Sequence, residues 1–324
     1  MQSSRSGGAS ARSVMRRSDS AHSRVSGSFG RRSLFGLFAA SAVGVASSGC
    51  ASPSSDRPSA PESSGVEAPS EPTTVPPSEE RSDGGSETDT TPSREEIAAR
   101  YEDAAPGEFG LDISGVQLAL PDGCSAAALT LDACGGATGS GVDAELLEHL
   151  RQLDIAATLF INRRWAQENP STMETILDEP LFEIQNHGDR HRPLSVSGAS
   201  AYGLPGTASA AEVYDEIMGG QDFLHEEYGV TCSYFRSGTA HLDEASVQIC
   251  RDLGLTPVNF TVNLDDGATL PAADVAARAG QISSGDIALG HFNQPDSGTS
   301  AGLRDSLPQL VAGDLRFITL QQAC

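Results

Sequence analysis

Short apolar segments alternate with segments of helical pattern from residue 126 to the C-terminus, and this alternation constrains the fold more than any other feature of the chain. Seven apolar segments predict strands, at 126–131, 155–161, 181–184, 232–235, 257–262, 286–289 and 317–320. Strands separated by helices form parallel sheets. We therefore predict an α/β fold, a distorted (β/α) barrel of about seven parallel strands with its site at the C-terminal strand ends. An open doubly wound sheet is the alternative.

The first third of the chain lacks the apolar residues of a packed core, so we divide the chain into three parts. Residues 1–50 predict a targeting segment. Residues 51–105 are rich in Ser, Pro and Glu and predict a disordered tether, because this composition cannot offset the entropy of ordering by burial. Residues 106–324 predict the folded domain.

The targeting segment resembles a twin-arginine export signal that ends in a lipobox. Arg31 and Arg32 precede an apolar run of small residues, and Cys50 follows it. The run is shorter than the roughly 20 residues of a membrane-spanning helix. We expect an exported lipoprotein that faces the cell wall or the extracellular space, with membrane attachment only through lipidated Cys50. Plain cleavage and release is the alternative.

The charge of the chain excludes several classes of function. The net charge is −23, and because residues 1–49 hold seven Arg and one acidic residue, the remainder carries 14 basic and 43 acidic residues. An acidic surface repels phosphate backbones, so nucleic acid is not an expected partner. The chain contains no Lys, which excludes Schiff-base and P-loop chemistry. No feature predicts a partner protein, and we expect a monomer.

Two histidines four residues apart, His187 and His191, follow the predicted strand 181–184. Two neutral imidazoles at this spacing can bind one divalent metal ion. The position after a strand of a parallel sheet favours a metal site over the alternative, a polar helix start. Zinc is the ion expected first for two imidazoles, with cobalt, nickel or manganese as alternatives.

Other predicted strands are also followed by a charged or titratable residue. These residues are Asp132, Arg236, the neighbours Asp265 and Asp266, and His291. A single residue of this kind is usually structural, but barrel enzymes assemble their active sites from successive strand ends. The pattern therefore predicts one shared site.

The order of these residues resembles the polysaccharide deacetylase family (NodB-homology domain, carbohydrate esterase family 4), over roughly residues 110–324. Residues 187–193 closely match the family's His-Ser/Thr-x-x-His-Pro type of motif. Residues 130–134, Thr-Leu-Asp-Ala-Cys, stand in the place of Thr-Phe-Asp-Asp-Gly. Looser matches are residues 236–239 for Arg-Pro-Pro-Tyr, Asp265 or Asp266 for the Asp-Trp motif, and residues 289–291 for Leu-x-His.

The resemblance implies an acid–base mechanism that uses a divalent metal. Asp132 would deprotonate a metal-bound water, and His291 would protonate the leaving amine. Arg236 would orient Asp132, while Asp265 or Asp266 would tune His291.

The resemblance also implies the metal ligands and the substrate contacts. His187, His191 and Asp132 are the predicted metal ligands. The amide of Thr239 would help to hold the tetrahedral oxyanion, and Leu289 and Asn293 are the other predicted substrate contacts.

Ala133 departs from the family pattern, because the family has its metal-ligating carboxylate at this place. Three interpretations remain open. Asp132 binds the metal and leaves the base role to Asp189 or Asp266, or a neighbouring carboxylate enters the coordination shell, or the domain is a catalytically silent glycan-binding module. A relative of the same fold that hydrolyses cyclic amides or ureides is a further alternative.

Five cysteines follow the predicted tether, in a chain that we expect to enter an oxidising compartment. Cys232 begins a predicted strand and Cys250 ends the next predicted helix, so we predict a disulfide between them. Cys134 lies beside the predicted site, and we interpret it as a small packing residue rather than a reactive thiol.

These observations lead to one hypothesis. We expect a metal-dependent hydrolase that removes N-acetyl groups, or less readily O-acetyl groups, from a glycan partner. The expected glycan is an amino-sugar polymer of the cell envelope or the extracellular space.

Overall fold

The central sheet contains seven parallel strands in the order β10-β11-β2-β3-β4-β7-β9. The computed structural model describes residues 91–323. The strands of this path are β2 (Ala126–Ala133), β3 (Ala157–Ile161), β4 (Phe182–Asn186), β7 (Tyr234–Phe235), β9 (Thr256–Pro257), β10 (Val262–Asn263) and β11 (Ile287–His291). β12 (Arg316–Phe317) pairs with the beginning of β2, beside this path. The predicted parallel α/β sheet of about seven strands is confirmed.

The two edge strands of the path, β9 and β10, are neighbours in sequence. Sequence analysis predicted one strand at 257–262, but the structure divides this segment between opposite edges of the sheet. Pro257 and Val262 are five residues apart, which allows a separation of at most about 18 Å. The sheet must therefore curl until its edges come close, which explains a barrel-like fold and excludes a flat open sheet.

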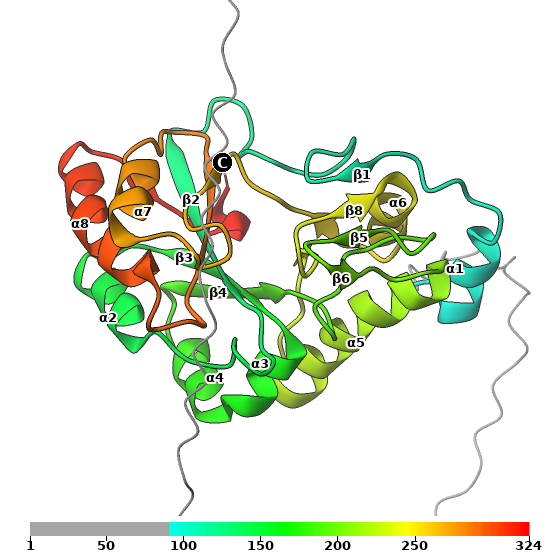
Figure 1. Ribbon diagram of the computed structural model, residues 1–324. Helices are drawn as coiled ribbons and strands as arrows, with labels where there is room; N and C mark the ends of the chain where they lie inside the picture. The colour runs from blue at the N-terminus through cyan, green and yellow to red at the C-terminus, as the bar shows by residue number, and fades with distance from the viewer. Residues whose placement is uncertain (1–90, 324) are drawn as a thin grey trace, which may run out of the picture. The chain divides into compact units, whose positions relative to one another are not determined.

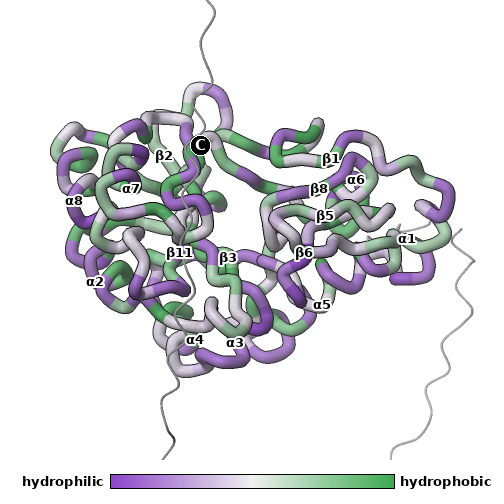
Figure 2. The backbone as a smooth tube through the Cα atoms, in the orientation of Figure 1, coloured by the Kyte–Doolittle hydropathy of each residue, from purple (hydrophilic) through white to green (hydrophobic). Residues whose placement is uncertain are grey.

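Helices connect the strands and cover the sheet (Figure 1). They are α2 (Ala144–Gln152), α3 (Arg163–Glu168), α4 (Pro170–Leu177), α5 (Ala210–Tyr228), α6 (Glu244–Asp252), α7 (Ala272–Ala279) and α8 (Gly298–Ala312), with a 3-10 turn at Leu320–Gln322. Apolar and polar positions alternate along these helices (Figure 2), as expected for amphipathic helices on a core. Two small two-stranded sheets, β5 (Ser200–Ala201) with β6 (Leu204–Pro205) and β1 (Phe109–Gly110) with β8 (Leu242–Asp243), complete the fold. No helix among residues 91–323 is long and apolar enough to cross a bilayer.

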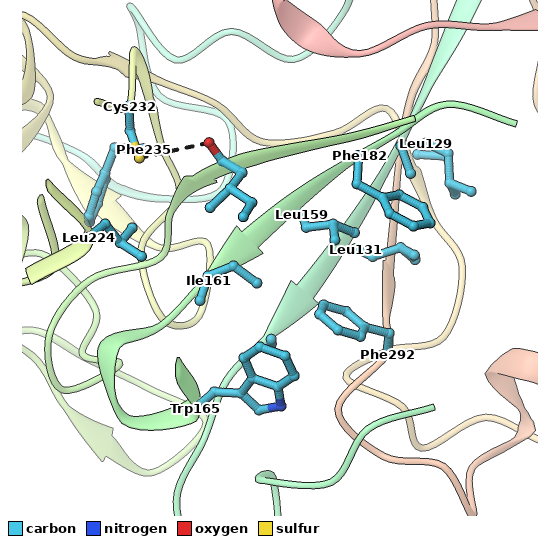
Figure 3. Close-up of a cluster of buried hydrophobic side chains, with 14 of the residues drawn as sticks. Leu129, Leu131, Leu159, Ile161, Trp165, Phe182, Leu224, Cys232, Phe235 and Phe292 are labelled. Carbon is cyan, nitrogen blue, oxygen red and sulfur yellow. Dashed lines mark hydrogen bonds between the residues drawn. The ribbon is translucent and has the colours of Figure 1, made fainter. Parts of the chain in front are cut away.

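The core lies between the sheet and the helices. All eight residues of β2 are buried, as expected for a parallel strand that is covered on both faces. Figure 3 shows Leu129 and Leu131 of β2 beside Leu159 of β3, with Trp165 and Phe292 closing the cluster. This rigid centre fixes the strand ends at which the site is built.

The predicted tether extends too far toward the C-terminus, because residues 94–100 form helix α1 (Arg94–Arg100). The helix begins with a capping box between Ser93 and Glu96, which satisfies two free N–H groups. Its Ile97 is fully buried, and its Arg94 pairs with Asp215 of α5 at 2.6 Å. The preceding residues are rich in Ser, Pro and Glu, so residues 94–100 were assigned to the tether with them. The predicted signal 1–50 and residues 51–90 of the predicted tether lie outside the described residues.

The predicted disulfide between Cys232 and Cys250 is wrong, because both thiols are free. The thiol of Cys232 points toward the carbonyl of Ile184 at 3.9 Å (Figure 3), and Cys250 is fully buried in α6. Both side chains pack in the hydrophobic core as small apolar groups. Burial raises the pKa of the Cys232 thiol to about 12, so this group is inert near neutral pH.

Candidate active site

The strand ends that carry the predicted residues meet at one edge of the sheet. In the register of the parallel pairs, His291 of β11 lies opposite Asp132 of β2. His187 directly follows β4, and Arg236 directly follows β7. Neighbouring parallel strands place their C-terminal ends side by side, so residues far apart in sequence share this edge.

Asp132 and Arg236 form a buried ion pair. Arg236 Nη1 donates to Asp132 Oδ1 at 2.7 Å, and the Arg236 side chain is fully buried. Arg236 Nε donates to the carbonyl of Val258 and Nη2 to that of Asn259, and the ring of Phe160 lies 4.1 Å from the guanidinium carbon. A planar group held on every side orients the carboxylate firmly. The second oxygen, Asp132 Oδ2, faces His187 Nε2 at 3.5 Å.

His291 and Asp265 form a second buried pair. Asp265 Oδ1 lies 2.9 Å from His291 Nδ1, and Asp265 Oδ2 accepts from the backbone N–H of His291 and the hydroxyl of Thr299, each at 2.8 Å. Burial alone would lower the pKa of His291, but the carboxylate of Asp265 holds it well above its usual value. A positively charged His291 can donate a proton to a leaving group.

Asp266 belongs to a different environment. Its carboxylate makes two hydrogen bonds to Arg278, at 2.8 and 2.9 Å, at an exposed position. Of the two neighbouring aspartates that the sequence left open, Asp265 therefore contacts His291, and Asp266 has no contact with the site. The difference arises at the end of β10, where Asp266 turns into a left-handed conformation with φ of 48°.

His187 and His191 lie in a loop rather than on a helical turn, because Gly188 and His191 both have positive φ, 84° and 61°. Their ring centroids are 4.9 Å apart. His187 Nδ1 lies 2.8 Å from the carbonyl of Arg236. A carbonyl can only accept, so Nδ1 carries the hydrogen in neutral His187, and the lone pair on Nε2 faces the site.

Glu216 of α5 holds the loop of residues 187–192, the histidine loop, through its backbone N–H groups. Its carboxylate accepts the backbone N–H groups of Arg190 at 3.0 Å and Arg192 at 3.1 Å, and its carbonyl accepts the N–H of Asp189 at 2.9 Å. Gly188 makes this approach possible, since a Cβ at this position would lie 2.5 Å from Glu216 Oε1. Burial raises the pKa of Glu216 to about 7, although the N–H groups oppose this shift.

Cys134 joins the two histidines. Its Sγ lies 3.8 Å from His187 Nε2, and the ligand atoms of Cys134, His187 and His191 all lie within 4.8 Å of one another. Burial alone would raise the pKa of the Cys134 thiol, but the imidazoles of His191, His187 and His291 lower it well below its usual value. In residues 91–323 this is the one group of at least three such ligand atoms, and Asp132 is outside it. Cys134 is therefore a candidate third ligand that the sequence did not indicate, while Asp132, the predicted ligand, has its Oδ2 3.5 Å from His187 Nε2.

Four other predicted residues occupy varied positions. Asn293 is buried, and its Nδ2 donates to the carbonyl of Gly139 at 2.8 Å, while its Oδ1 has no partner among the described residues. Leu289 is buried two residues before His291 on the same face of β11. Thr239 is half-buried in the loop after β7, and its hydroxyl has no partner among the described residues. Asp189, the alternative base, pairs with Arg163 at 3.0 Å.

Sequence reasoning missed the roles of Cys134 and Glu216. Alternation along β2 could have indicated Cys134, because it lies two residues after Asp132 and so on the same face of an extended chain. No sequence signal identified Glu216, because an acidic residue inside an amphipathic helix usually faces solvent.

Comparisons with known proteins show what part of this chain is similar to. The model of the polysaccharide deacetylase family matches residues 120–258. Among solved structures, a carbohydrate esterase family 4 pseudoenzyme from Bacillus anthracis has a TM-score of 0.54 at 21% identity, over 65% of this chain and 70% of that one. A mutant of that pseudoenzyme with restored enzymatic activity gives the same TM-score.

Two further structures show the same fold. A peptidoglycan N-acetylglucosamine deacetylase has a TM-score of 0.55 at 21% identity, over 64% of this chain and 92% of that one. A family 4 carbohydrate esterase from Streptomyces lividans, in complex with acetate, has a TM-score of 0.50 at 23% identity, over 62% and 96%. The comparison with curated proteins found no match.

Proposed function

We propose that the chain hydrolyses N-acetyl groups on an amino-sugar polymer of the cell envelope, and the match of residues 120–258 to the polysaccharide deacetylase model supports this. One observation carries the proposal. Two buried ion pairs lie at the same edge of the sheet as His187 and His191. These pairs are Asp132 with Arg236 and His291 with Asp265. Such an arrangement separates a base from an acid, which amide hydrolysis requires.

The residues that would hold a divalent ion are Cys134, His187 and His191. Their donor set of one sulfur and two imidazole nitrogens fits a tetrahedral site with one open position. A bound ion would polarise the carbonyl oxygen of the acetyl group and lower the pKa of a water molecule.

The chain's own residues would move the protons. Asp132 accepts a proton from the attacking water, and Arg236 fixes the direction of the carboxylate through the 2.7 Å hydrogen bond. The C–N bond of the acetamide then breaks, and His291 donates its proton to the leaving amine nitrogen. Asp265 keeps His291 charged for this step. The products are acetate and a free amine on the sugar.

Thr239 is the candidate for oxyanion stabilisation. It lies in the loop after Arg236, where the backbone of Gly238 is so close to His191 that a Cβ there would meet the His191 Cα at 2.4 Å. This contact places the amide of Thr239 beside the histidine loop. A backbone N–H in this position can donate to the oxygen that gains charge in the transition state.

We also propose where the protein works. Arg31, Arg32 and Cys50 support export and lipid attachment at the outer face of the membrane. This location would bring the domain to peptidoglycan or another envelope glycan, and it suits a monomer that acts on a polymer.

Acetate release tests the proposed function. The chain is incubated with N-acetylglucosamine oligomers and with peptidoglycan, and acetate is measured for the parent and for Asp132→Asn. We expect Asp132→Asn to lose about 10²- to 10⁴-fold in rate, because the general base is removed. Asp266→Asn is the matched control, since this carboxylate pairs with Arg278 at the surface, and it should retain the parent rate.

A second candidate is a catalytically silent glycan-binding module. The presence of Ala133, where the first motif of the family has its second aspartate, favours this candidate. This candidate predicts polymer binding without acetate release, and equal binding by the parent and Asp132→Asn. Acetate release by the parent that Asp132→Asn abolishes would exclude it.

A further inference from the structure

Cys134 occupies the place at which a third metal ligand is needed. Its Sγ lies 3.8 Å from His187 Nε2. Ideal tetrahedral geometry, with Zn–S of about 2.3 Å and Zn–N of about 2.0–2.1 Å, places a sulfur and a nitrogen ligand about 3.6 Å apart. The observed separation of Cys134 and His187 is close to this value, and the ligand atom of His191 lies within 4.8 Å of both.

The neighbouring carboxylates have other partners. Asp132 lies outside the ligand group: its Oδ1 accepts from Arg236, and its Oδ2 lies 3.5 Å from His187 Nε2 alone. Asp189 pairs with Arg163, and Asp265 pairs with His291. Among the described residues, no carboxylate oxygen forms a group with His187 and His191 in which all three ligand atoms lie within 4.8 Å of one another.

The backbone holds Cys134 in this place. The carbonyl of Cys134 accepts a hydrogen bond from Arg164 Nη2 at 3.1 Å, and the carbonyl of Ala133 accepts the N–H of Asn162 at 3.0 Å. Gly135 follows with φ of 72°, and a Cβ there would meet the backbone N of Trp165 at 2.6 Å. These contacts hold the backbone on both sides of Cys134, whose Sγ lies 3.8 Å from His187 Nε2, and a ligand requires such support.

We propose that Cys134 binds the metal as a thiolate and makes this site selective for thiophilic divalent ions, with zinc as the natural occupant. The inference rests on the proposed function, because it concerns the metal of the same site. Thiolate and imidazole ligands favour zinc and other soft or borderline ions, whereas carboxylate and water ligands suit manganese and magnesium. A site with sulfur in place of the carboxylate oxygen therefore discriminates against manganese.

Cobalt substitution tests the ligand directly. Co²⁺ bound to a thiolate gives a sulfur-to-cobalt charge-transfer absorption in the near ultraviolet, and Co²⁺ bound only to nitrogen and oxygen does not. We expect this band at one equivalent of Co²⁺ in the parent chain and its loss in Cys134→Asp, with Co²⁺ still bound. Cys232→Ala is the matched control, because this buried free thiol lies in the core, and it should keep the band.

Selectivity and alkylation give two further measurements. The ratio of zinc affinity to manganese affinity should fall by about 10-fold or more in Cys134→Asp, because a carboxylate replaces the thiolate. Zinc should also slow the alkylation of Cys134 by iodoacetamide, which mass spectrometry of the digested chain would show. Cys250 is the internal reference for this measurement, since its full burial protects it with or without zinc.

The outcomes separate this inference from the proposed function. A parent chain that binds Co²⁺ without the charge-transfer band, or that binds neither Co²⁺ nor Zn²⁺, would overturn the inference. If acetate release remains in that case, the proposed function survives. If the band is present and no acetate is released from any polymer, the proposed function fails and the thiolate site stands.

Discussion

Asp132 and Cys134 face the site, while Ala133 between them faces the core. Ala133 ends β2, pairs with Ile161 of β3 and is fully buried among apolar side chains. In an extended strand, successive side chains point to opposite faces. The side chain of residue 134 therefore lies on the face of the site, and we propose it as the substitute for the carboxylate that the family motif has at residue 133.

We predict that Ala133→Asp destabilises the protein and adds no metal ligand. The new carboxylate would enter the apolar core, and an unpaired buried charge should lower the free energy of unfolding by about 3 kcal/mol or more. Urea denaturation measures this loss, and mass spectrometry measures the metal content. Cys134→Asp is the matched control, because it places the same carboxylate toward the histidines. A stable Ala133→Asp variant with increased zinc affinity would contradict the assignment of residue faces.

We predict that Asp265→Asn weakens the fold in a pH-dependent manner. Breaking a buried charged pair costs about 3–5 kcal/mol. Burial alone would raise the pKa of Asp265, but His291 lowers it overall from the unfolded value of 3.8. A carboxyl whose pKa is lowered by folding contributes stability above its unfolded pKa and loses it as pH falls through the folded pKa.

The melting temperature of the parent and of Asp265→Asn, measured from pH 7 to pH 3, checks this sign. The difference between the two should be largest between pH 3.8 and pH 6.5, the unfolded values of Asp265 and His291, because both partners of the pair are charged there. It should shrink below pH 3.8. A difference that grows as pH falls below 3.8 would refute the role of the Asp265 carboxylate in this pair. Asp266→Asn serves as the control, since Asp266 is exposed and pairs with Arg278.

At the residue scale, sequence reasoning could place polar residues after strands but could not choose between neighbours. The choice between Asp265 and Asp266 depends on a backbone turn with positive φ at Asp266, which several residue types adopt. Asn293 is a polar residue in a predicted loop, where sugar-binding residues often lie. In the structure it is buried and donates to the carbonyl of Gly139. Such choices depend on contacts between segments far apart in sequence, which a linear pattern does not contain.

At the scale of elements, α5 connects the core to the histidine loop. The helix buries Val213, Ile217 and Leu224 against the core. The same buried side directs Glu216 to the backbone N–H groups of Arg190 and Arg192. The position of the histidine loop therefore depends on how this helix packs.

We predict that Glu216→Gln lowers zinc affinity about 10- to 100-fold without unfolding the protein, because residues that orient metal ligands have effects of this size. A neutral amide can accept only at its oxygen, so it cannot reproduce every hydrogen bond of the carboxylate. Competition with a fluorescent zinc chelator measures the affinity. Glu226→Gln, an exposed position on the same helix, is the matched control. Unchanged affinity in Glu216→Gln would indicate that the loop is held by other contacts.

We predict that helix α1 stabilises the domain although it precedes the predicted boundary at residue 106. Ile97 is fully buried, and Ile97→Ala should cost about 2–5 kcal/mol through lost burial and a cavity. Urea denaturation would show this as a lower midpoint. Glu95→Ala on the exposed side of α1 should leave the midpoint nearly unchanged. Equal midpoints for the two variants would show that α1 is not part of the cooperative unit.

The strands that contain long apolar runs could be predicted from the sequence, whereas the strands of only two residues could not. β2 and β11 were recognised because their apolar runs are continuous. The division of residues 257–262 between β9 and β10 was not predictable, because each strand has only two residues. These two strands lie at opposite edges of the sheet only because the whole sheet is curved, and a short stretch of sequence does not show this curvature.

At the scale of the molecule, the curled sheet gathers the strand ends into one site, and sequence analysis predicted this because the barrel class requires it. The acidic charge of residues 50–324 suits an uncharged or weakly charged glycan better than a polyanion. Delivery of the domain to such a polymer is a separate requirement, and residues 1–50 carry the candidate signals for it.

We predict that Cys50→Ser releases the protein from the membrane fraction without loss of acetate release from soluble oligomers. Lipid chains attach a protein in proportion to the buried methylene groups, at about 0.8 kcal/mol each, so removal of the modified cysteine removes the anchor. Fractionation of cells that express the full chain, followed by immunoblotting, measures the distribution. Replacing Arg31 and Arg32 by Lys should instead retain the protein inside the cell, since the signal requires the arginine pair. If Cys50→Ser remains in the membrane fraction, attachment has another origin, and the proposed location must be abandoned while the proposed chemistry remains open to its own test.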